Sequence, residues 1–194
     1  KYKKIFNDVY AIYSYILNTS EIEKITNDII KLLKIDNKKT KNGINEKDIL
    51  LITYADTIFA KKTKPLKVLN AFLNKFIKNV INIIHILPYY PSSSDGGFAV
   101  IDFFSIDNKF GNWSDIKKLS KSYKIMSDIV LNHASSNSKW FKNFLKEQGE
   151  GKDYFLCVDK DSNIKNVVRA RSHELIQKFS TTSGDKYLWC TFSR

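Results

Sequence analysis

The pattern of apolar and polar positions first predicts a helical stretch over residues 1 to 36. Apolar residues recur there at the spacing of one helix face: Ile22, Ile25, Ile29, Leu32 and Leu33. Residues 20 to 23, Ser-Glu-Ile-Glu, have the capping-box pattern with which many helices begin. The polar and charged residues 36 to 48 then predict a solvated linker. We therefore expect residues 1–48 to form a helical appendage and a linker.

Three short apolar runs follow, and each predicts a strand: residues 49–55, 81–87 and 124–133. The first is β-branched and uncharged, which suits a strand that is buried on both faces, and the second has the same character. Alternation along the third would place Asp128, Val130 and Asn132 on one face and Ile129, Leu131 and His133 on the other. A charged Asp128 inside an apolar strand is costly unless it is paired, so we expect it to have a basic partner.

Helical patterns separate these strands. Pro65 opens a helix at the position that proline favours, and the apolar stripe of this helix contains Leu66, Leu69, Phe72, Leu73, Phe76 and Ile77. A second helix, which Ser114 is expected to cap, carries Ile116 and Leu119. Strands that alternate with helices indicate right-handed βαβ units and a parallel sheet, so the predicted fold class is α/β. After residue 133 we expect one helix, with Trp140, Phe141, Phe144 and Leu145, and otherwise irregular structure.

The composition supports a packed core and narrows the classes of partner. Of the 194 residues, 43% are hydrophobic, which argues against a disordered chain. The net charge is +12, and such an excess can indicate nucleic-acid binding. The lysines are scattered, however, and no cluster of basic and aromatic residues occurs, so nucleic acid is not expected as a partner.

The cysteines and the apolar runs suggest the cellular setting. Cys157 and Cys190 fit neither a zinc site nor a disulfide framework, so we expect two free thiols in a reducing compartment. No metal and no other cofactor is expected. No apolar run is long enough to span a bilayer, and the start of the chain lacks the pattern of a secretory signal peptide. The prediction is a cytoplasmic protein without a membrane contact.

Candidate chemistry gathers where the predicted strands end, which is where parallel α/β folds bind their ligands. Residues 54–56 lie at the end of the first strand, and Asp128, Asn132 and His133 form the group at the end of the third. The loop after the second strand, PYYPSSSDGGF, carries Asp95, two glycines that let a ligand approach the backbone, and Phe98. A carboxylate beside an aromatic ring is typical of sugar recognition. From spacing alone, Asp95 could equally be a turn residue and His133 a structural histidine.

Several ordered segments resemble one known family. The segments are ITYAD, HILPYYPSSSDGGFAVIDFFSID, DIVLNH, WFKNFL, VVRAR and KYLWCTFS. Together they resemble the sucrose phosphorylase branch of the α-amylase superfamily, which includes phosphorylases of sucrose and of glucosylated glycerol or glycerate. The resemblance begins near residue 49, and the helical start is also similar to an N-terminal appendage found in part of the branch. It implies a (β/α)8 TIM barrel with a domain inserted after its third strand. Residues 49–133 would hold the first three strands, and residues 134–194 most of the inserted domain.

The resemblance also implies roles for individual residues. Substrate binding would fall to Asp95, Phe98, His133, Arg169 and Arg171. Among these, Asp95 would bind a hydroxyl of the glucosyl unit, Phe98 would form an aromatic wall, and His133 would hydrogen-bond the same sugar. The two arginines would face the leaving group or the incoming phosphate, which suits a guanidinium fork.

Two further residues would support the site, and a few positions depart from the family pattern. Asp128 and Asn132 would be supporting residues, with Asp128 paired to an arginine on the fourth barrel strand. The branch usually has Tyr, Asp and Ser where this chain has Ser92, Gly96 and Ala99. The usual Arg-Pro-Arg is Arg-Ala-Arg over residues 169–171, which loosens a rigid pairing of the two arginines.

The catalytic carboxylates of the family find no counterpart in this sequence. Retaining glycoside chemistry needs a nucleophile and an acid/base, which this family places after the fourth and fifth strands. We therefore expect the N-terminal portion of a retaining phosphorylase that converts an α-glucoside and inorganic phosphate into α-glucose 1-phosphate. By itself this portion is expected to be inactive and poorly stable. Two alternatives stay open: a non-catalytic sugar- or phosphate-binding module, and a basic interaction protein derived from a decayed enzyme gene.

Overall fold

A computed structural model describes residues 1–35, 44–168 and 172–191. The chain divides into two compact units, Lys1–Asn45 and Glu46–Arg194. The division of the second unit into barrel strands up to residue 133 and an inserted domain from residue 134 stays a prediction.

The first unit is a helical hairpin of α1 (Tyr2–Tyr13) and α2 (Thr19–Ile35). Its contact surface buries Val9 and Ile22. The expected capping box at residues 20–23 is wrong, because α2 begins at Thr19, two residues earlier than a cap at Ser20 implies. The Asn18 side chain accepts from the Glu21 N–H at 3.0 Å, and the Glu21 carboxylate accepts from the Asn18 N–H at 2.8 Å. Asparagine caps a helix as well as serine does, so the true box lies two residues upstream of the predicted one.

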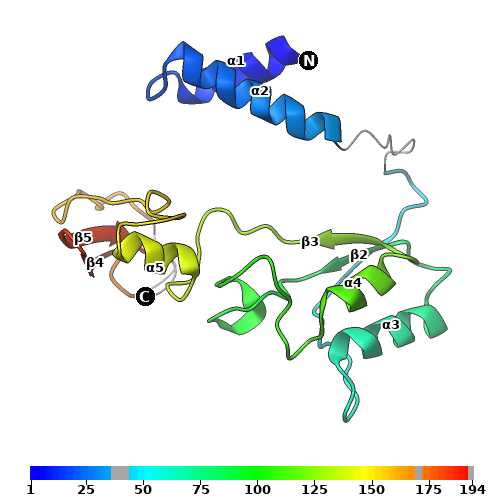
Figure 1. Cartoon of the computed structure of the whole chain (residues 1–194). Coiled ribbons are helices and arrows are strands. Elements are labelled where there is room, and N and C mark those ends of the chain that lie inside the picture. The colour runs from blue at the N-terminus through cyan, green and yellow to red at the C-terminus, as the bar shows by residue number, and fades with distance from the viewer. Residues whose placement is uncertain (36–43, 169–171, 192–194) are drawn as a thin grey trace. The chain divides into compact units, whose positions relative to one another are not determined.

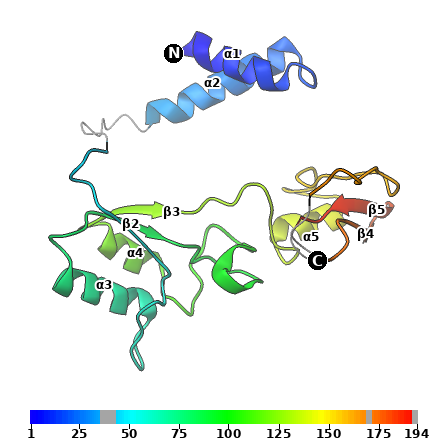
Figure 2. The same ribbon diagram turned by 180° about the vertical axis from the view of Figure 1, so that it is seen from behind.

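The second unit contains a three-stranded parallel sheet in the order β1-β2-β3. The strands are β1 (Leu50–Thr53), β2 (Ile83–Ile86) and β3 (Lys124–Ser127). Helices α3 (Pro65–Phe76) and α4 (Trp113–Leu119) connect them. Both helices lie on the same side of the sheet (Figures 1 and 2). The predicted alternation of strands and helices in a parallel sheet is therefore confirmed.

One face of the sheet is packed and the other is open. The leucines of α3 and α4 pack with Ile84 and Ile86 in the main hydrophobic core, and each fully buried side chain of this size contributes about 1.5–3 kcal/mol. The opposite face exposes Leu50, Ile52 and Met126, with Ile52 58% exposed. The expectation that the first strand is buried on both faces is thus wrong, because among the described residues the helices cover one face only.

The amino ends of the three strands are tied together by polar side chains. The Asp48 carboxylate is 4% exposed and accepts from Asn82 Nδ2 at 2.7 Å and from Lys124 Nζ at 3.2 Å. Asn82 Oδ1 accepts in turn from the Ile49 N–H at 2.9 Å. One polar cluster thus joins residues just before β1 and β2 to the first residue of β3. This cluster helps to fix the register of the three strands.

Two sequence expectations for this unit need correction. Asn112, not Ser114, caps α4: Asn112 Oδ1 accepts from the Ser114 N–H at 2.9 Å, and Asp115 accepts from the Asn112 N–H at 3.1 Å. The third strand was expected to reach residue 133 but ends at Ser127. Its partner β2 ends in register with it, since Ile86 pairs with Ser127, so the following residues leave the ladder.

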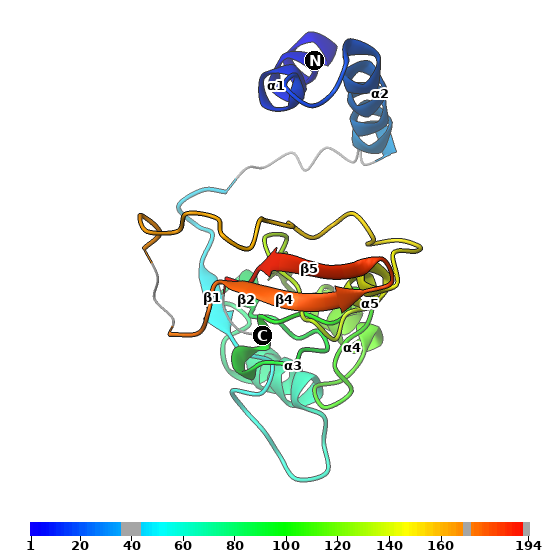
Figure 3. The same ribbon diagram turned by 90° about the vertical axis from the view of Figure 1, so that its left-hand side faces the viewer.

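The remainder of the unit contains a helix and a hairpin. Helix α5 (Lys139–Leu145) forms where the aromatic pattern predicted it. Strands β4 (Ile176–Thr181) and β5 (Gly184–Trp189) form an antiparallel hairpin in a region that was expected to be irregular (Figure 3). Phe141 and Phe144 of α5 pack with Leu188 of β5. Glu147, just after α5, accepts from Lys186 Nζ at 2.5 Å and from Ser183 Oγ at 2.6 Å. These bonds hold the pKa of Glu147 at about 2.

Candidate functional site

The loop after β2 is held in one conformation by its glycines and serines. It includes a single helical turn, Asp95–Gly97, in which Gly96 and Gly97 have φ angles of 71° and 84°. A Cβ on Gly97 would lie 2.5 Å from the Pro88 carbonyl oxygen, so any side chain there would force the backbone to shift. Ser92 Oγ donates to the Ala99 carbonyl at 2.9 Å, which closes the loop at its base. The backbone of Asp95 thus has a defined place, whereas its side chain lies outside the described part.

His133 links this loop to the segment that follows β3. Its Nε2 lies 3.1 Å from the Phe98 carbonyl oxygen, and its Nδ1 lies 2.8 Å from Asn132 Nδ2. Because a carbonyl oxygen can only accept, Nε2 donates to it, and Nδ1 then accepts from the Asn132 amide. The side chains of Asn132 and His133 therefore meet, and the expectation that they lie on opposite faces is wrong, since this segment has left the sheet.

A pair of serines makes a second link between the same two segments. The hydroxyls of Ser93 and Ser135 lie 2.6 Å apart, and the Ser135 N–H donates to the Val100 carbonyl at 3.0 Å. Ser135 is buried. Sequence reasoning missed this contact, because two serines 42 residues apart carry no recognisable spacing.

The partner of Asp128 within the described residues is His85. Asp128 Oδ2 lies 3.0 Å from His85 Nε2, and both side chains are largely buried. Within the described residues, Asp128 thus contacts a histidine of the neighbouring strand, and the expected pairing with an arginine stays a prediction. Beside this pair, the Tyr89 and Ser127 hydroxyls lie 2.6 Å apart. Burial and the adjacent Tyr89 raise the pKa of Tyr90, which keeps its hydroxyl protonated.

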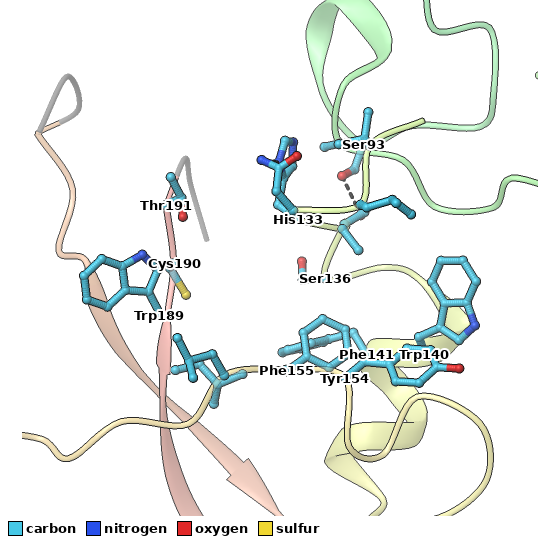
Figure 4. A pocket seen from close by; sticks show the side chains of 18 of the residues that line it. Ser93, His133, Ser136, Trp140, Phe141, Tyr154, Phe155, Trp189, Cys190 and Thr191 are labelled. Atoms are coloured by element: carbon cyan, nitrogen blue, oxygen red, sulfur yellow. Dashed lines mark hydrogen bonds between the residues drawn. The ribbon is translucent and has the colours of Figure 1, made fainter. Parts of the chain in front are cut away.

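A pocket of about 460 Å³ opens beside His133. This volume lies within the range of about 300–1,000 Å³ that small-molecule sites occupy. Its polar side is lined by Ser93, Asn132, His133, Ser135, Ser136 and Thr191. Across the pocket lie aromatic rings, among them Trp140, Phe141, Tyr154 and Phe155 (Figure 4). The pocket joins the carboxyl ends of the strands to α5 and the β4–β5 hairpin.

The other predicted site residues lie beside this pocket or outside the described part. Phe98 is 39% exposed and is not among the lining residues, although its carbonyl accepts from His133. Arg169 and Arg171 lie outside the described residues. Tyr54 and Asp56 line a second pocket of about 310 Å³ on the Gly96–Gly97 side of the loop.

Two classes of site find no support in the described part of the chain. Over residues 1–35, 44–168 and 172–191, no group of three or more His, Cys, Asp and Glu side chains is placed to hold a metal ion. None of the helices described there is long and apolar enough to cross a membrane.

Comparison with known proteins places this geometry in a family. The model of the α-amylase catalytic domain matches residues 74–191. A glucosylglycerate phosphorylase of Allomeiothermus silvanus is 40% identical over 156 residues, which is 80% of this chain and 28% of that enzyme. The crystal structure of a sucrose 6F-phosphate phosphorylase from Thermoanaerobacter thermosaccharolyticum is 32% identical with a TM-score of 0.65, covering 79% of this chain and 32% of that one.

The chain therefore belongs to the α-amylase family. Within the family, the relatives that it matches include phosphorylases of glucosylglycerate, of sucrose and of sucrose 6F-phosphate, so the resemblance to the sucrose phosphorylase branch is confirmed. A glucosylglycerate phosphorylase of Escherichia coli is 33% identical over 192 residues, or 98% of this chain, so that match extends to the helical hairpin. The chain spans only about a third of the length of these relatives, 28% and 34% of the two glucosylglycerate phosphorylases.

Proposed function

We propose that this chain contributes part of the glucosyl pocket of a retaining α-glucoside phosphorylase. The reaction would convert an α-glucoside and inorganic phosphate into α-glucose 1-phosphate and the released acceptor. The observation that carries the proposal is the His133–Phe98 bond, which brings the segments after β2 and β3 together beside the pocket. The names of the relatives support phosphate as the second substrate.

The parallel sheet fits the beginning of a barrel. In this proposal β1, β2 and β3 are the first three strands of a (β/α)8 barrel, and residues 134–194 belong to a domain inserted after the third. The open face, with Leu50, Ile52 and Met126, would be the inner face of that barrel. The His85–Asp128 pair would then lie in the barrel interior, where Asp128 could also receive an arginine from a fourth strand. A cytoplasmic location is part of the same proposal.

The proposed donor site uses the predicted residues. Asp95 binds hydroxyls of the glucosyl unit from the glycine turn, with Phe98 as an aromatic wall. His133 adds a hydrogen bond, which requires that a sugar hydroxyl share or replace one of its two ring contacts. His133 is therefore also a positioning residue for the loop that carries Asp95. Arg169 and Arg171 would bind phosphate through the paired N–H groups that guanidinium offers.

The chemistry proposed for the whole enzyme is a double displacement. A carboxylate attacks the anomeric carbon while an acid protonates the departing oxygen, and phosphate then attacks the glucosyl ester with the same acid/base now deprotonated. Both carboxylates follow later strands in this family, and neither Asp95 nor Asp128 matches their positions. We therefore propose that the 194 residues alone bind substrate groups without turnover.

A chimera tests this function. The part of the Escherichia coli glucosylglycerate phosphorylase that matches this chain is replaced by residues 1–194, and phosphate-dependent release of α-glucose 1-phosphate from glucosylglycerate and from sucrose is measured. We expect turnover by the chimera, a loss of about 100-fold or more in the Asp95→Asn chimera, and none from the 194 residues alone. A chimera that melts cooperatively but releases no α-glucose 1-phosphate from either substrate would contradict the proposal.

A second candidate is a sugar-binding module without catalysis. The observation in its favour is that the pocket beside His133 is formed entirely within the described residues. Tight binding of sucrose by the isolated chain, combined with an inactive chimera, would favour this function over the first.

A further inference from the structure

The donor site proposed above leaves the aromatic side of the pocket without a role. Figure 4 shows Tyr154 and Phe155 across the pocket from His133. Phe155 packs edge-to-face on the buried Phe141, with ring centroids 5.0 Å apart and planes at 83°. Tyr154 is different, because it lines the pocket and is nevertheless 63% exposed. Its ring therefore presents area at the pocket that a ligand can cover.

The ring of Tyr154 is held in place before any ligand arrives. Its centroid lies 6.3 Å from that of Trp140, with the planes at 52°. The Tyr154 N–H donates to the Gly151 carbonyl at 3.1 Å. Gly151 has a φ of 101°, and a Cβ there would lie 2.5 Å from Trp140 Cα, so this loop packs directly on the backbone of α5. Such support lowers the entropy that a ligand must remove when it stacks on the ring.

The aromatic side is also continuous with the loop that carries the donor site. Phe103 lies 6.1 Å from Trp140 and 5.2 Å from Tyr90, measured between ring centroids. Tyr90, Phe103, Trp140 and Tyr154 thus form one row of rings that starts in the loop after β2 and ends at the exposed Tyr154. A ligand that begins at His133 and extends along the pocket would reach this end of the row.

We propose that Tyr154, backed by Trp140, forms a stacking surface for a second sugar ring of the α-glucoside, the ring that leaves. This inference rests on the proposed function, because it assumes that the glucosyl unit occupies the His133 side. A sugar ring has a face of C–H groups that packs on an aromatic ring, and tyrosine offers that area with only two rotatable side-chain angles. The ligand class is therefore a two-ring α-glucoside rather than a glucoside of a small acyclic acceptor.

Binding of three probes to the full chain tests this inference. Methyl α-glucoside carries one ring, sucrose carries two, and glucosylglycerate carries one ring and an acyclic acid. Isothermal titration should show that sucrose binds roughly 3- to 10-fold more tightly than methyl α-glucoside, which is the ratio expected from one aromatic stacking contact. Tyr154→Ala should remove this advantage and leave methyl α-glucoside and glucosylglycerate unchanged. Tyr154→Phe, which keeps the ring, should retain the advantage.

A matched control separates stacking from loss of fold. Tyr15→Ala removes a tyrosine that is 80% exposed in the helical hairpin, and it should change no affinity. Methyl α-glucoside binding without a sucrose advantage, or an equal loss for all probes in Tyr154→Ala, overturns this inference alone. Failure of the unchanged chain to bind any probe overturns the inference together with the proposed glucosyl pocket.

Discussion

Replacing Gly97 by alanine should destabilise the second unit more than the same change at Gly96, the residue before it. Both glycines have positive φ angles, 84° and 71°, so either substitution costs about 1–2 kcal/mol for the left-handed backbone. Their surroundings differ. A Cβ at Gly96 meets nothing closer than 3.6 Å, whereas a Cβ at Gly97 lies 2.5 Å from the Pro88 carbonyl oxygen. Backbone does not move aside as a flexible side chain does, so overpacking adds about 1–3 kcal/mol at Gly97 only.

Urea unfolding of the two variants, followed by circular dichroism, isolates the steric part. The difference in unfolding free energy between Gly97→Ala and Gly96→Ala should be about 1–3 kcal/mol, which corresponds to a Tm lower by about 2–12 °C for a chain of this size. The slope of the unfolding free energy against urea concentration serves as the control. It should be the same for both variants, which shows that they expose the same surface on unfolding. Equal destabilisation of the two variants would refute the close approach of this loop to Pro88.

Three further predictions follow from described contacts. Asn112→Ala should cost about 1 kcal/mol of unfolding free energy through loss of the helix cap, and Ser114→Ala clearly less, measured by denaturant unfolding. A double-mutant cycle of His85→Phe and Asp128→Asn should give a coupling of about 0.5–3 kcal/mol, and a value near zero would show that the pair contributes nothing. The pKa of Glu147 in the folded protein is about 2, below its ordinary value. The stability that this carboxylate contributes should therefore be complete above about pH 4.5 and should be lost as the pH falls towards 2. When Tm is measured as a function of pH, Glu147→Gln should abolish this acid-dependent decrease.

The parts of the fold that local patterns determine were predicted well. Helix α3 follows from Pro65 and its leucine spacing, β2 from a short run rich in isoleucine, and α5 from its aromatic residues. The cap of α4 was misplaced because Asn112 and Ser114 are both good caps, and the choice between them depends on where the backbone turns. These errors shift an element by a few residues and do not change its existence.

The parts that depend on distant contacts were not predictable from the sequence. The β4–β5 hairpin has polar residues such as Lys178 and Ser180 at its exposed positions, and its apolar residues pack against α5 and Phe155, which are distant in the sequence. The Ser93–Ser135 contact and the aromatic side of the pocket arise when separate segments pack together. For the same reason, the sequence named His133 as a site residue but not Tyr154, which no motif distinguishes.

The cluster of Asp48, Asn82 and Lys124 has a consequence for synthesis on the ribosome. The contact between Asp48 and Lys124 spans 76 residues, so it cannot form until that length of chain has emerged. At about 5–20 residues per second, this delay is roughly 4–15 s. During that time β1 lacks the cluster that aligns it, and its apolar side chains are accessible to chaperones and to other nascent chains. The order of synthesis thus leaves the first strand without this support until Lys124 has been made.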